Sequence, residues 1–532
     1  MKQILSAEEI SAEHPDYLRD ESRVTAARAD ALVWPETEAD VLTALALARA
    51  HGWPVTVSAA RTGIVAAAVP LSGGMVLSLE QMSMQKELVH HPDTDTWSLI
   101  VEPGALLCGI QESLDNNFYF YTSRWPERAQ AAVALLKERT LRLFYPPDPT
   151  EMSATIGGTV ATNASGARTF KYGATRPFVR RLRVALADGT VLDIPRGNVF
   201  ARDGVLTIPP ELVVVGEPRN YCIPLPSYSM PATKHCAGYY AAPAMDLIDL
   251  FIGSEGTLGV IAEIEIDVVV RVKARLSIMA FFASEPQALD FVVALRAAIR
   301  QGIFDVEALE YFGASALQVL RDRRTPSDKT IPDIPPADAA VFAEFAISAD
   351  AMEAAMELLE QYLICHGSST ETAWAGMDDA EIQKMKLVRH AVPETINQMI
   401  GERKRTLPAL HKIATDLAVP DEQLHAIMQY YHEQLDNTGL QYVMFGHIGN
   451  NHLHVNILPR DEAELARAKQ LYRAFAEKAI ALNGTVAAEH GIGKLKRECL
   501  RSMFGDEGIA QMRAVKHALD PSGMLNPGAL FA

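Results

Sequence analysis

Three histidines occur within eight residues of one stretch, Phe445 to Leu458, which reads FGHIGNNHLHVNIL. Apolar residues at both ends and turn formers at Gly449 to Asn451 predict a strand, a turn and a second strand. His447 ends the first strand and His454 lies in the second, so the turn can bring the two imidazoles together. Because a neutral imidazole is a common ligand for divalent metals, this stretch predicts part of a metal site.

A third ligand is available in AEHGIGK, a segment of small and flexible residues that carries Glu489 and His490. Two histidines and one carboxylate, with one coordination position left open, are typical of a catalytic metal site rather than a structural one. The competing interpretation is a polar loop whose histidines only satisfy hydrogen bonds. We favour the metal site because the two segments occur together in one chain.

Composition limits the classes of function. The chain has 532 residues, 48% of them hydrophobic, which predicts several domains with substantial cores. A net charge of −17 disfavours nucleic acid as a partner, since phosphate binding needs a basic surface, but local cations can still bind a small anionic substrate. Five scattered cysteines without a CxxC pair argue against a disulfide framework or an iron–sulfur cluster and fit a cytoplasmic location.

No run of about 18 apolar residues occurs, so no transmembrane segment is predicted, although contact with the inner face of a membrane remains open. The N-terminus turns acidic early and has no long apolar core, so it predicts a short helix and a linker rather than a signal peptide. Ser6 and Glu9 have the spacing of a capping box for that helix.

The first half of the chain alternates strand and helix signals, with Glu38 to His51 as the clearest helix and Arg181 to Ile194 as a hairpin. Ala154 to Gly173 is rich in Gly, Ala, Ser and Thr, so its backbone can approach a large ligand and its N–H groups can hold phosphates. A small-residue helix packed under a sheet is the alternative. Phe251 to Ile266 repeats a glycine-rich turn before a strand, but neither segment has the Walker or GxGxxG pattern.

After about residue 270 the pattern changes. Helices predicted over Glu285 to Gln301 and Asp350 to His366 lie between short strands such as Leu276 to Phe282 and Ala339 to Ala346. Strands and helices in this order predict a second, ferredoxin-like α+β domain, and both metal-candidate segments lie in this half of the chain.

Eight separate motifs now agree on one family, over almost the whole chain. The motifs are VWPETEADV (33–41), ARTGIVAAAVP (60–70), VEPG (101–104), ATIGGTVATNASG (154–166), GSEGTLGVI (253–261), GHIGNNHLH (446–454), AEHGIG (488–493) and LDPSGMLNPG (519–528). By these motifs the chain resembles the FAD-linked oxidoreductases of the vanillyl-alcohol oxidase/PCMH superfamily, and within it the D-lactate dehydrogenase, D-2-hydroxyglutarate dehydrogenase and glycolate oxidase large-subunit group.

The resemblance implies an α+β protein with a PCMH-type FAD-binding domain of two α/β subdomains and a ferredoxin-like α+β domain for substrate and metal. The implied divisions are an N-terminal helix and linker (1–26), the FAD domain (27–268), the substrate and metal domain (269–495), and a C-terminal segment (496–532) that returns to the flavin domain.

The resemblance also implies the residues that hold FAD. Two loops would wrap the pyrophosphate and ribityl chain, the small-residue stretch would line the flavin, Glu255, Gly256 and Ile261 would meet the adenine end, and Asn526 would lie near the isoalloxazine. The implied residues are Arg61, Thr62, Gly63, Ile64, Val65, Ala66, Pro147, Asp148, Pro149, Thr150, Thr155, Gly157, Gly158, Thr162, Ser165, Gly166, Glu255, Gly256, Ile261 and Asn526.

In the second domain, the resemblance implies His447, His454 and Glu489 as metal ligands, with Zn²⁺ expected and Mn²⁺ or Fe²⁺ as alternatives. It implies His490 as the general base, Asn456 beside the metal, and Arg389 with Lys412 as the clamp for a substrate carboxylate. The implied reaction is oxidation of an (R)-2-hydroxy acid such as D-lactate, D-2-hydroxyglutarate or glycolate to the 2-oxo acid, with hydride passing to flavin N5. A quinone, an iron–sulfur subunit, an electron-transfer flavoprotein or oxygen is the expected acceptor, and a homodimer is compatible with this assignment.

Two departures from the family pattern stand out. Val65, Ala66 and Ala67 replace glycines and a small hydroxyl residue, so their Cβ atoms are expected to crowd the phosphates or shift the loop. Asn450-Asn451-His452 replaces a common Asp-Gly-Asn, and the role of His452 is left open. Two other interpretations are kept: a metallohydrolase that uses the His/His/Glu site, and a non-enzymatic or weakly flavinated subunit of a flavoprotein assembly.

Overall fold

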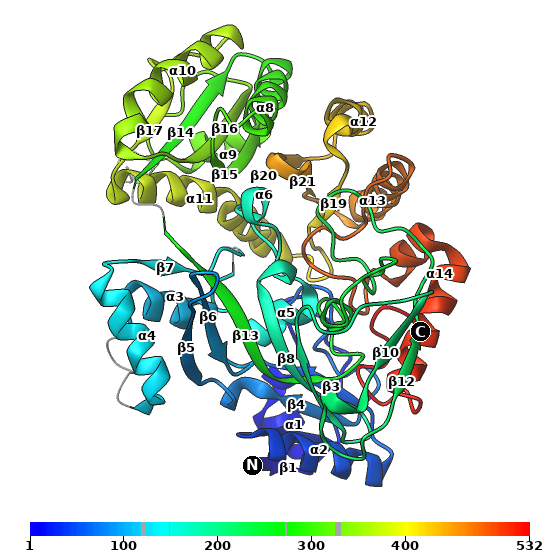
Figure 1. Cartoon of the computed structure of the whole chain (residues 1–532). Helices are drawn as coiled ribbons and strands as arrows, with labels where there is room; N and C mark the ends of the chain where they lie inside the picture. Colours follow the sequence, from blue (N-terminus) through cyan, green and yellow to red (C-terminus); the bar gives the residue numbers. More distant parts are fainter. Residues whose placement is uncertain (119–123, 148, 150, 272–273, 325–330) are drawn as a thin grey trace.

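The computed structural model describes residues 1–118, 124–147, 149, 151–271, 274–324 and 331–532. Three main sheets organise the chain (Figure 1), and the largest carries the histidine stretch. Helix α14, near the C-terminus, packs beside strand β12 at the right of the view. The fold is the mixed α+β architecture that the family resemblance implies.

The first sheet has four strands in the order β1-β2-β4-β3, and the last three run parallel. Helix α2 begins and ends as predicted, because Thr37 accepts a hydrogen bond from the Asp40 N–H and Gly52 closes the helix with φ +65°. Ser6 caps α1 by accepting from the Glu9 N–H. The elements are β1 (Lys2–Ile4), α1 (Ala7–Glu13), β2 (Ala31–Trp34), α2 (Glu38–His51), β3 (Val55–Ser58) and β4 (Met75–Ser78).

The expectation of only a helix and linker before residue 27 was incomplete. Residues Lys2–Ile4 form an antiparallel edge strand on Ala31–Trp34. Three residues give too short a pattern for alternation to be recognised in the sequence.

The second sheet is antiparallel, with the order β11-β9-β8-β13-β6-β5 and β7 on the far part of β13. The predicted hairpin is present as β8 and β9, and Gly189 turns between them with φ +91°. The small-residue stretch forms α5, which packs on β13 of this sheet, and α6, which packs on β15 of the third sheet. The strands are β5 (Gln85–His91), β6 (Thr96–Val101), β7 (Leu143–Phe144), β8 (Val179–Ala185), β9 (Val191–Pro195), β11 (Val213–Val215) and β13 (Val260–Val270).

Several helices and a two-stranded ribbon accompany the second sheet. The helices are α3 (Leu107–Asp115), α4 (Glu127–Glu138), α5 (Ile156–Thr162), α6 (Thr169–Tyr172) and α7 (Ile248–Phe251), and the ribbon is β10 (Val205–Ile208) with β12 (Tyr221–Pro224).

The third sheet has eight strands, and its first part is the predicted ferredoxin-like unit. Strands β14, β15, β16 and β17 alternate with α8 and α10 in a β-α-β-β-α-β pattern and lie in the order β17-β14-β16-β15, all antiparallel. Strand β20 extends the sheet at the β15 edge and is followed by β21 and β18, with β19 also on β21. The strands are β14 (Arg275–Phe282), β15 (Val306–Gly313), β16 (Ala339–Ala346), β17 (Trp374–Gly376), β18 (Ile413–Ala414), β19 (Leu417–Ala418), β20 (Tyr442–His447) and β21 (His452–Ile457).

The remaining helices cover this sheet and lead back to the first one. They are α8 (Glu285–Arg300), α9 (Ala314–Arg323), α10 (Met352–Cys365), α11 (Asp379–Lys404), α12 (Leu424–Leu435), α13 (Glu462–Ala481) and α14 (Arg497–Leu519). After α14 the chain reaches the first sheet, where the Val55 N–H donates to the Met524 carbonyl and the Val55 carbonyl accepts from the Asn526 N–H, which forms a bridge from Val55 to Leu525.

Candidate active site

The strand pair β20–β21 positions the histidines as the sequence predicts. His447 pairs with His452 across the ladder, and His454 lies two residues further on the same face. The turn needs its glycines: Gly446 has φ +140°, and a Cβ there would lie 2.9 Å from the His452 carbonyl oxygen. A Cβ on Gly449 would lie 2.7 Å from the Phe170 ring, so α6 of the flavin half packs directly on the turn.

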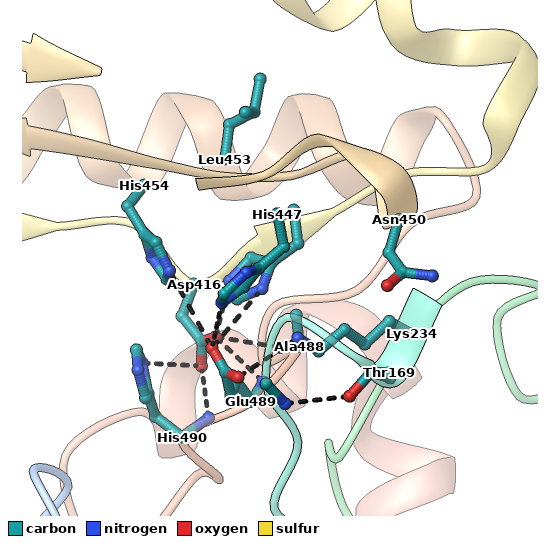
Figure 2. A network of polar contacts seen from close by, with 12 residues as sticks. Thr169, Lys234, Asp416, His447, Asn450, Leu453, His454, Ala488, Glu489 and His490 are labelled. Atoms are coloured by element: carbon teal, nitrogen blue, oxygen red, sulfur yellow. Dashed lines mark hydrogen bonds and ion pairs between the residues drawn. The ribbon is translucent and has the colours of Figure 1, made fainter. Parts of the chain in front are cut away.

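The imidazoles of His447 and His454 point toward Glu489 (Figure 2), and His452 approaches the same carboxylate. Its Oε2 lies 3.3 Å from His447 Nε2, 3.7 Å from His452 Nδ1 and 3.9 Å from His454 Nε2. One donor atom from each of these four residues lies within 4.8 Å of the others. Metal–nitrogen bonds of about 2.0–2.1 Å place neighbouring ligand atoms about 3.3 Å apart in a tetrahedron. The separations of 3.3–3.9 Å between Glu489 and the three imidazoles are close to this spacing, so the group is a candidate metal centre.

The outward nitrogens of His447 and His454 are held by acceptors. His447 Nδ1 lies 2.6 Å from Glu310 Oε1, and His454 Nδ1 lies 3.2 Å from the Thr415 carbonyl. Such partners fix the tautomer and turn the other nitrogen toward a metal. Burial lowers the pKa of His454 well below its usual range, whereas Glu310 and Glu489 raise the pKa of His447 against the effect of burial.

Asp416 is the buried acid at the centre of the polar network, and it was not among the predicted site residues. Its Oδ1 lies 3.2 Å from His452 Nε2, and its Oδ2 accepts from Lys496 Nζ at 2.6 Å and lies 3.4 Å from His490 Nδ1. Burial works against ionisation, but His490 and Lys496 hold the pKa of Asp416 well below its usual range.

Lys234 comes from the flavin half and was also missed. Its Nζ lies 3.2 Å from Glu489 Oε1, on the opposite oxygen from the histidines, and its side chain is buried. Lys234 and His447 together hold the pKa of Glu489 well below its usual range despite burial. Nearby, the Cys236 N–H donates to the Ala487 carbonyl at 2.9 Å, so this segment is anchored beside AEHGIG.

The structure brings the predicted clamp arginine to the same network. Arg389, on α11, lies 3.4 Å from Glu310 Oε2, the carboxylate whose other oxygen supports His447. Asn456 is buried on β21, and its Nδ2 donates to the His454 carbonyl at 3.2 Å. Lys412 directly precedes β18, which pairs with Asn456 and Ile457, and burial lowers the Lys412 pKa. His490 is partly exposed and stacks against His454 with ring centroids 5.8 Å apart.

The predicted phosphate loop at residues 61–67 contains an alanine in a backbone conformation that favours glycine. Ala66 adopts φ +58°, a left-handed conformation that costs an alanine about 1–2 kcal/mol. Val65 and Ala66 are buried, whereas Gly63 and Ile64 are exposed. The Val65 carbonyl accepts from the Lys494 N–H at 2.9 Å, so this loop is joined to the segment that carries Glu489.

The small-residue stretch is a short helix with a tight approach. Thr155 caps α5 by accepting from the Gly158 N–H, and a Cβ on Gly157 would lie 2.8 Å from the Pro103 carbonyl. The Thr162 hydroxyl donates back to the Gly158 carbonyl, so it is engaged within the helix. The Gly166 N–H donates to the Thr169 hydroxyl at 2.9 Å. The stretch therefore contains the tightly packed small-residue helix that was one of the two interpretations, and its role in approaching a ligand stays a prediction.

Several polar groups in these loops are buried without a hydrogen-bond partner among the described residues. They include Ser165 Oγ, Asn526 Oδ1 and, at the end of β3, Ser58 Oγ, which sequence reasoning missed. A bound polar cofactor would satisfy such groups. The other predicted residues of the cofactor site differ in burial. Arg61 stacks on Tyr17 and contacts Glu80, and Thr62 beside it is half-buried. Pro147 and Ile261 are buried and Pro149 is partly buried, whereas Asp148 and Thr150 lie outside the described residues.

Two segments of the predicted cofactor site are in direct contact. Glu255 and Gly256 were expected at the adenine end of FAD and Asn526 at the isoalloxazine end. Asn526 Nδ2 donates to the Glu255 carbonyl at 2.8 Å, so the structure brings these residues together. The Glu255 carboxylate accepts from the N–H groups of Ile492 and Gly493, and burial raises its pKa to about 7.

Comparison with known protein families covers both halves of the chain. The model for the FAD binding domain matches residues 29–134 and 127–195, and the model for the C-terminal domain of FAD linked oxidases matches residues 271–530. The chain belongs to the FAD-linked oxidases. It is therefore an FAD-dependent enzyme, and the interpretations as a metallohydrolase or a non-enzymatic subunit are set aside.

Curated relatives of this FAD-linked oxidase align over nearly its whole length. The glycolate oxidase subunit GlcD of Bacillus subtilis is 26% identical over 94% of this chain and 89% of its own. The probable mitochondrial D-lactate dehydrogenase of Danio rerio is 27% identical over 98% of this chain and 88% of its own. The D-2-hydroxyglutarate dehydrogenase of Stutzerimonas stutzeri is 24% identical over 97% of this chain and 94% of its own.

Solved structures agree on the fold. The 4-ethylphenol oxidase of Gulosibacter chungangensis superposes with a TM-score of 0.63 at 14% identity, over 99% of this chain and 93% of that chain. An alkyldihydroxyacetonephosphate synthase gives a TM-score of 0.60 at 14% identity, over 94% of this chain and 77% of that chain. Within the described residues, no helix combines the length and apolar character needed to cross a bilayer.

Proposed function

We propose that this FAD-linked oxidase oxidises a small (R)-2-hydroxy acid to the 2-oxo acid, assisted by a divalent metal at His447, His454 and Glu489. The carrying observation is the convergence of these three donors, whose outward atoms are held by Glu310, the Thr415 carbonyl and Lys234. The curated relatives that align over the whole chain are a glycolate oxidase subunit, a D-lactate dehydrogenase and a D-2-hydroxyglutarate dehydrogenase, which supports the substrate class.

The residues around the site fit a carboxylate-bearing substrate. Arg389 offers a planar, charged fork that can hold a carboxylate in two hydrogen bonds. Its position on the far side of Glu310 from His447 would set the carboxylate a fixed distance from the metal ligands. Lys412 is assigned to the same carboxylate, and a fixed orientation of the hydroxyl carbon is the main gain from such a clamp.

His490 is assigned as the base that takes the hydroxyl proton. It is partly exposed, stacks on His454, and its Nδ1 faces Asp416 Oδ2 at 3.4 Å. A carboxylate behind the imidazole orients the ring and stabilises its charged form, and the other ring nitrogen is left to accept a proton. Asn456 is assigned a place beside the metal, where its amide is already fixed by the His454 carbonyl.

The two cofactors supply the remaining chemistry. FAD would accept the two electrons of the oxidation, and Ser58, Ser165 and Asn526 would hold it with their unpartnered polar atoms. A divalent cation, Zn²⁺ first and Mn²⁺ or Fe²⁺ as alternatives, would lower the pKa of the substrate hydroxyl. A FAD domain over 27–268 and a substrate and metal domain over 269–495 remain our proposed division.

Electron transfer beyond the flavin is proposed only by class. A quinone, an iron–sulfur subunit or an electron-transfer flavoprotein would reoxidise FAD. A cytoplasmic location with peripheral membrane contact would suit a quinone as the acceptor. The experiment avoids this choice by measuring flavin reduction without any acceptor.

Purified protein is mixed anaerobically with the D- and L-forms of lactate and 2-hydroxyglutarate and with glycolate, and loss of the oxidised-flavin absorbance is followed. We expect rapid bleaching by at least one D-acid or glycolate and much slower bleaching by the L-acids. Removal of metal with a chelator should stop the reaction, and restored metal should recover it. If none of these acids reduces the flavin, the proposal fails.

Two variants test the assignments of neighbouring residues. Glu489→Gln should lose the metal, whereas His490→Asn should keep metal and FAD while flavin reduction slows by about 10²–10⁴-fold. His425→Asn on α12 is the matched control, since it removes an exposed histidine that lies outside the cluster and contacts Asp290 at 3.4 Å. Metal loss in His490→Asn with retention in Glu489→Gln would reverse the two roles.

A further inference from the structure

His452 is the one member of the histidine cluster without an assigned role. It is completely buried on β21 and faces the same side as His454, directly opposite His447. Its Nδ1 lies 3.7 Å from Glu489 Oε2, and the other two imidazoles approach that same oxygen at 3.3 Å and 3.9 Å. The residue is therefore placed like a ligand, not like a support for one.

The nitrogen of His452 that faces away from Glu489 has an acidic neighbour, as the corresponding nitrogens of His447 and His454 have an acceptor. Its Nε2 lies 3.2 Å from Asp416 Oδ1, as the outward nitrogens of His447 and His454 face Glu310 and a carbonyl. An acidic or carbonyl partner behind a ring fixes the tautomer in which the inner nitrogen carries a lone pair. All three inner nitrogens then present lone pairs to one another and to a carboxylate oxygen.

Such an arrangement is unfavourable without a positive charge at its centre. The Nδ1 of the fully buried His452 ring makes no hydrogen bond with any described residue, and its Nε2 has only the 3.2 Å approach to Asp416. An unsatisfied buried polar group costs about 1–3 kcal/mol. Lys234 does not fill the gap, because its ammonium contacts Oε1 of Glu489 and the imidazoles approach Oε2.

We propose that His452 is a fourth protein ligand, so that three imidazoles and one carboxylate hold the cation. This inference deepens the proposed function and rests on its metal site. Four protein ligands close a tetrahedral Zn²⁺ site, so binding of a substrate oxygen requires a coordination number above four. First-row cations that accept five or six ligands, Mn²⁺ and Fe²⁺ among them, suit the site better than a strictly tetrahedral ion.

The decisive measurement counts imidazoles in the wild-type protein. The purified full-length protein is freed of metal with a chelator and reloaded with Cu²⁺, and pulsed electron paramagnetic resonance then counts the coordinated imidazole rings. We expect three. A count of two would overturn the assignment of His452 while leaving the His447, His454 and Glu489 site intact, so the two proposals fail separately.

Variants give a second readout that does not depend on turnover. Binding of Co²⁺ is titrated against a chromophoric chelator in wild type, His452→Asn, His454→Asn and the control His425→Asn, with circular dichroism and FAD content as checks on folding. His452→Asn should weaken Co²⁺ binding by more than the roughly 10–100-fold typical of losing a supporting group. The His452→Asn substitution should also change the visible Co²⁺ spectrum, as we expect for His454→Asn.

The outcomes separate cleanly. If His454→Asn weakens binding and His452→Asn leaves both affinity and spectrum unchanged, His452 is a buried neighbour of Asp416 and not a ligand. If wild type binds no divalent cation, the metal part of the proposed function fails together with this inference, while FAD binding is unaffected. If His452→Asn does not fold, the wild-type imidazole count alone decides.

Discussion

Replacement of Asp416 by asparagine should destabilise the protein strongly, although the two side chains have almost the same shape. Asp416 is 1% exposed, and its Oδ2 accepts from Lys496 Nζ at 2.6 Å. The same carboxylate accepts the N–H groups of Glu489 at 3.0 Å and His490 at 3.1 Å. An amide in this position would remove the negative charge and direct N–H groups toward other donors.

The magnitude follows from what the change leaves behind. Lys496 is largely buried, and Asp416 raises its pKa against the effect of burial, so the ammonium depends on this partner. Removal of one partner from a buried ion pair costs about 3–5 kcal/mol, because the other charge stays desolvated and unpaired. We expect a loss of unfolding free energy in that range for Asp416→Asn.

Urea unfolding followed by circular dichroism can measure this loss in Asp416→Asn, in Lys496→Met and in the double variant. The double variant should be more stable than the sum of the single losses predicts, with a coupling of about 1–3 kcal/mol. A loss below about 1 kcal/mol in Asp416→Asn, or no coupling to Lys496, would refute the ion-pair argument.

Three further predictions test other parts of the molecule. Acid precipitation should release all the yellow colour, because residues 60–70 contain no histidine or cysteine that could bond the flavin, and colour in the pellet would contradict this. Ala66→Gly should stabilise the protein by roughly 1 kcal/mol, because alanine is strained at φ +58°, and should tighten FAD binding in a titration; weaker binding would mean that the loop is already adapted. The hydrogen bond to Glu285 raises the pKa of His432 from 6.5 to about 9, so the stability it adds is complete below about pH 6.5 and is lost as pH rises toward 9. The melting temperature of wild type should therefore approach that of His432→Gln at high pH, and a pH-independent gap would count against this pair.

Local features of the fold could be predicted because they depend on neighbouring residues. Helix α2, the β8–β9 hairpin and the strand–turn–strand at 442–457 follow from caps, turn residues and apolar alternation. The supports of the metal candidates could not, because they arise from distant strands: Glu310 is 137 residues before His447, and Lys234 is 255 residues before Glu489.

A weaker signal for these supports was present. Asp416 follows Ile413-Ala414-Thr415 and precedes Leu417-Ala418-Val419, and Glu310 lies within the apolar strand Val306–Gly313. A charged residue inside an apolar run is buried with a partner when the run is buried. The pattern thus indicates that such acids have partners, but only the fold identifies them as His447, His452 and Lys496.

The segment Ala488–Gly493 explains how neighbouring residues can take different roles. Asp416 accepts the N–H groups of residues 488, 489 and 490, the Cys236 sulfur accepts that of Gly491, and Glu255 accepts those of residues 492 and 493. Two of these three acceptors, Cys236 and Glu255, belong to the flavin half, while Asp416 belongs to the sheet that carries the histidines.

Six consecutive N–H groups are therefore fixed by side chains from both halves of the molecule. Gly491 and Gly493 permit the turn, with φ values of +80° and +53°, and a Cβ on Gly493 would lie 2.1 Å from the Val65 carbonyl of the phosphate loop. The backbone can then direct Glu489 toward the imidazoles and His490 toward Asp416 without either side chain being free to exchange places. Because the same segment contacts the loop at Val65 and the histidine cluster, its rigidity would, in the function we propose, keep the flavin and the substrate hydroxyl at a constant separation.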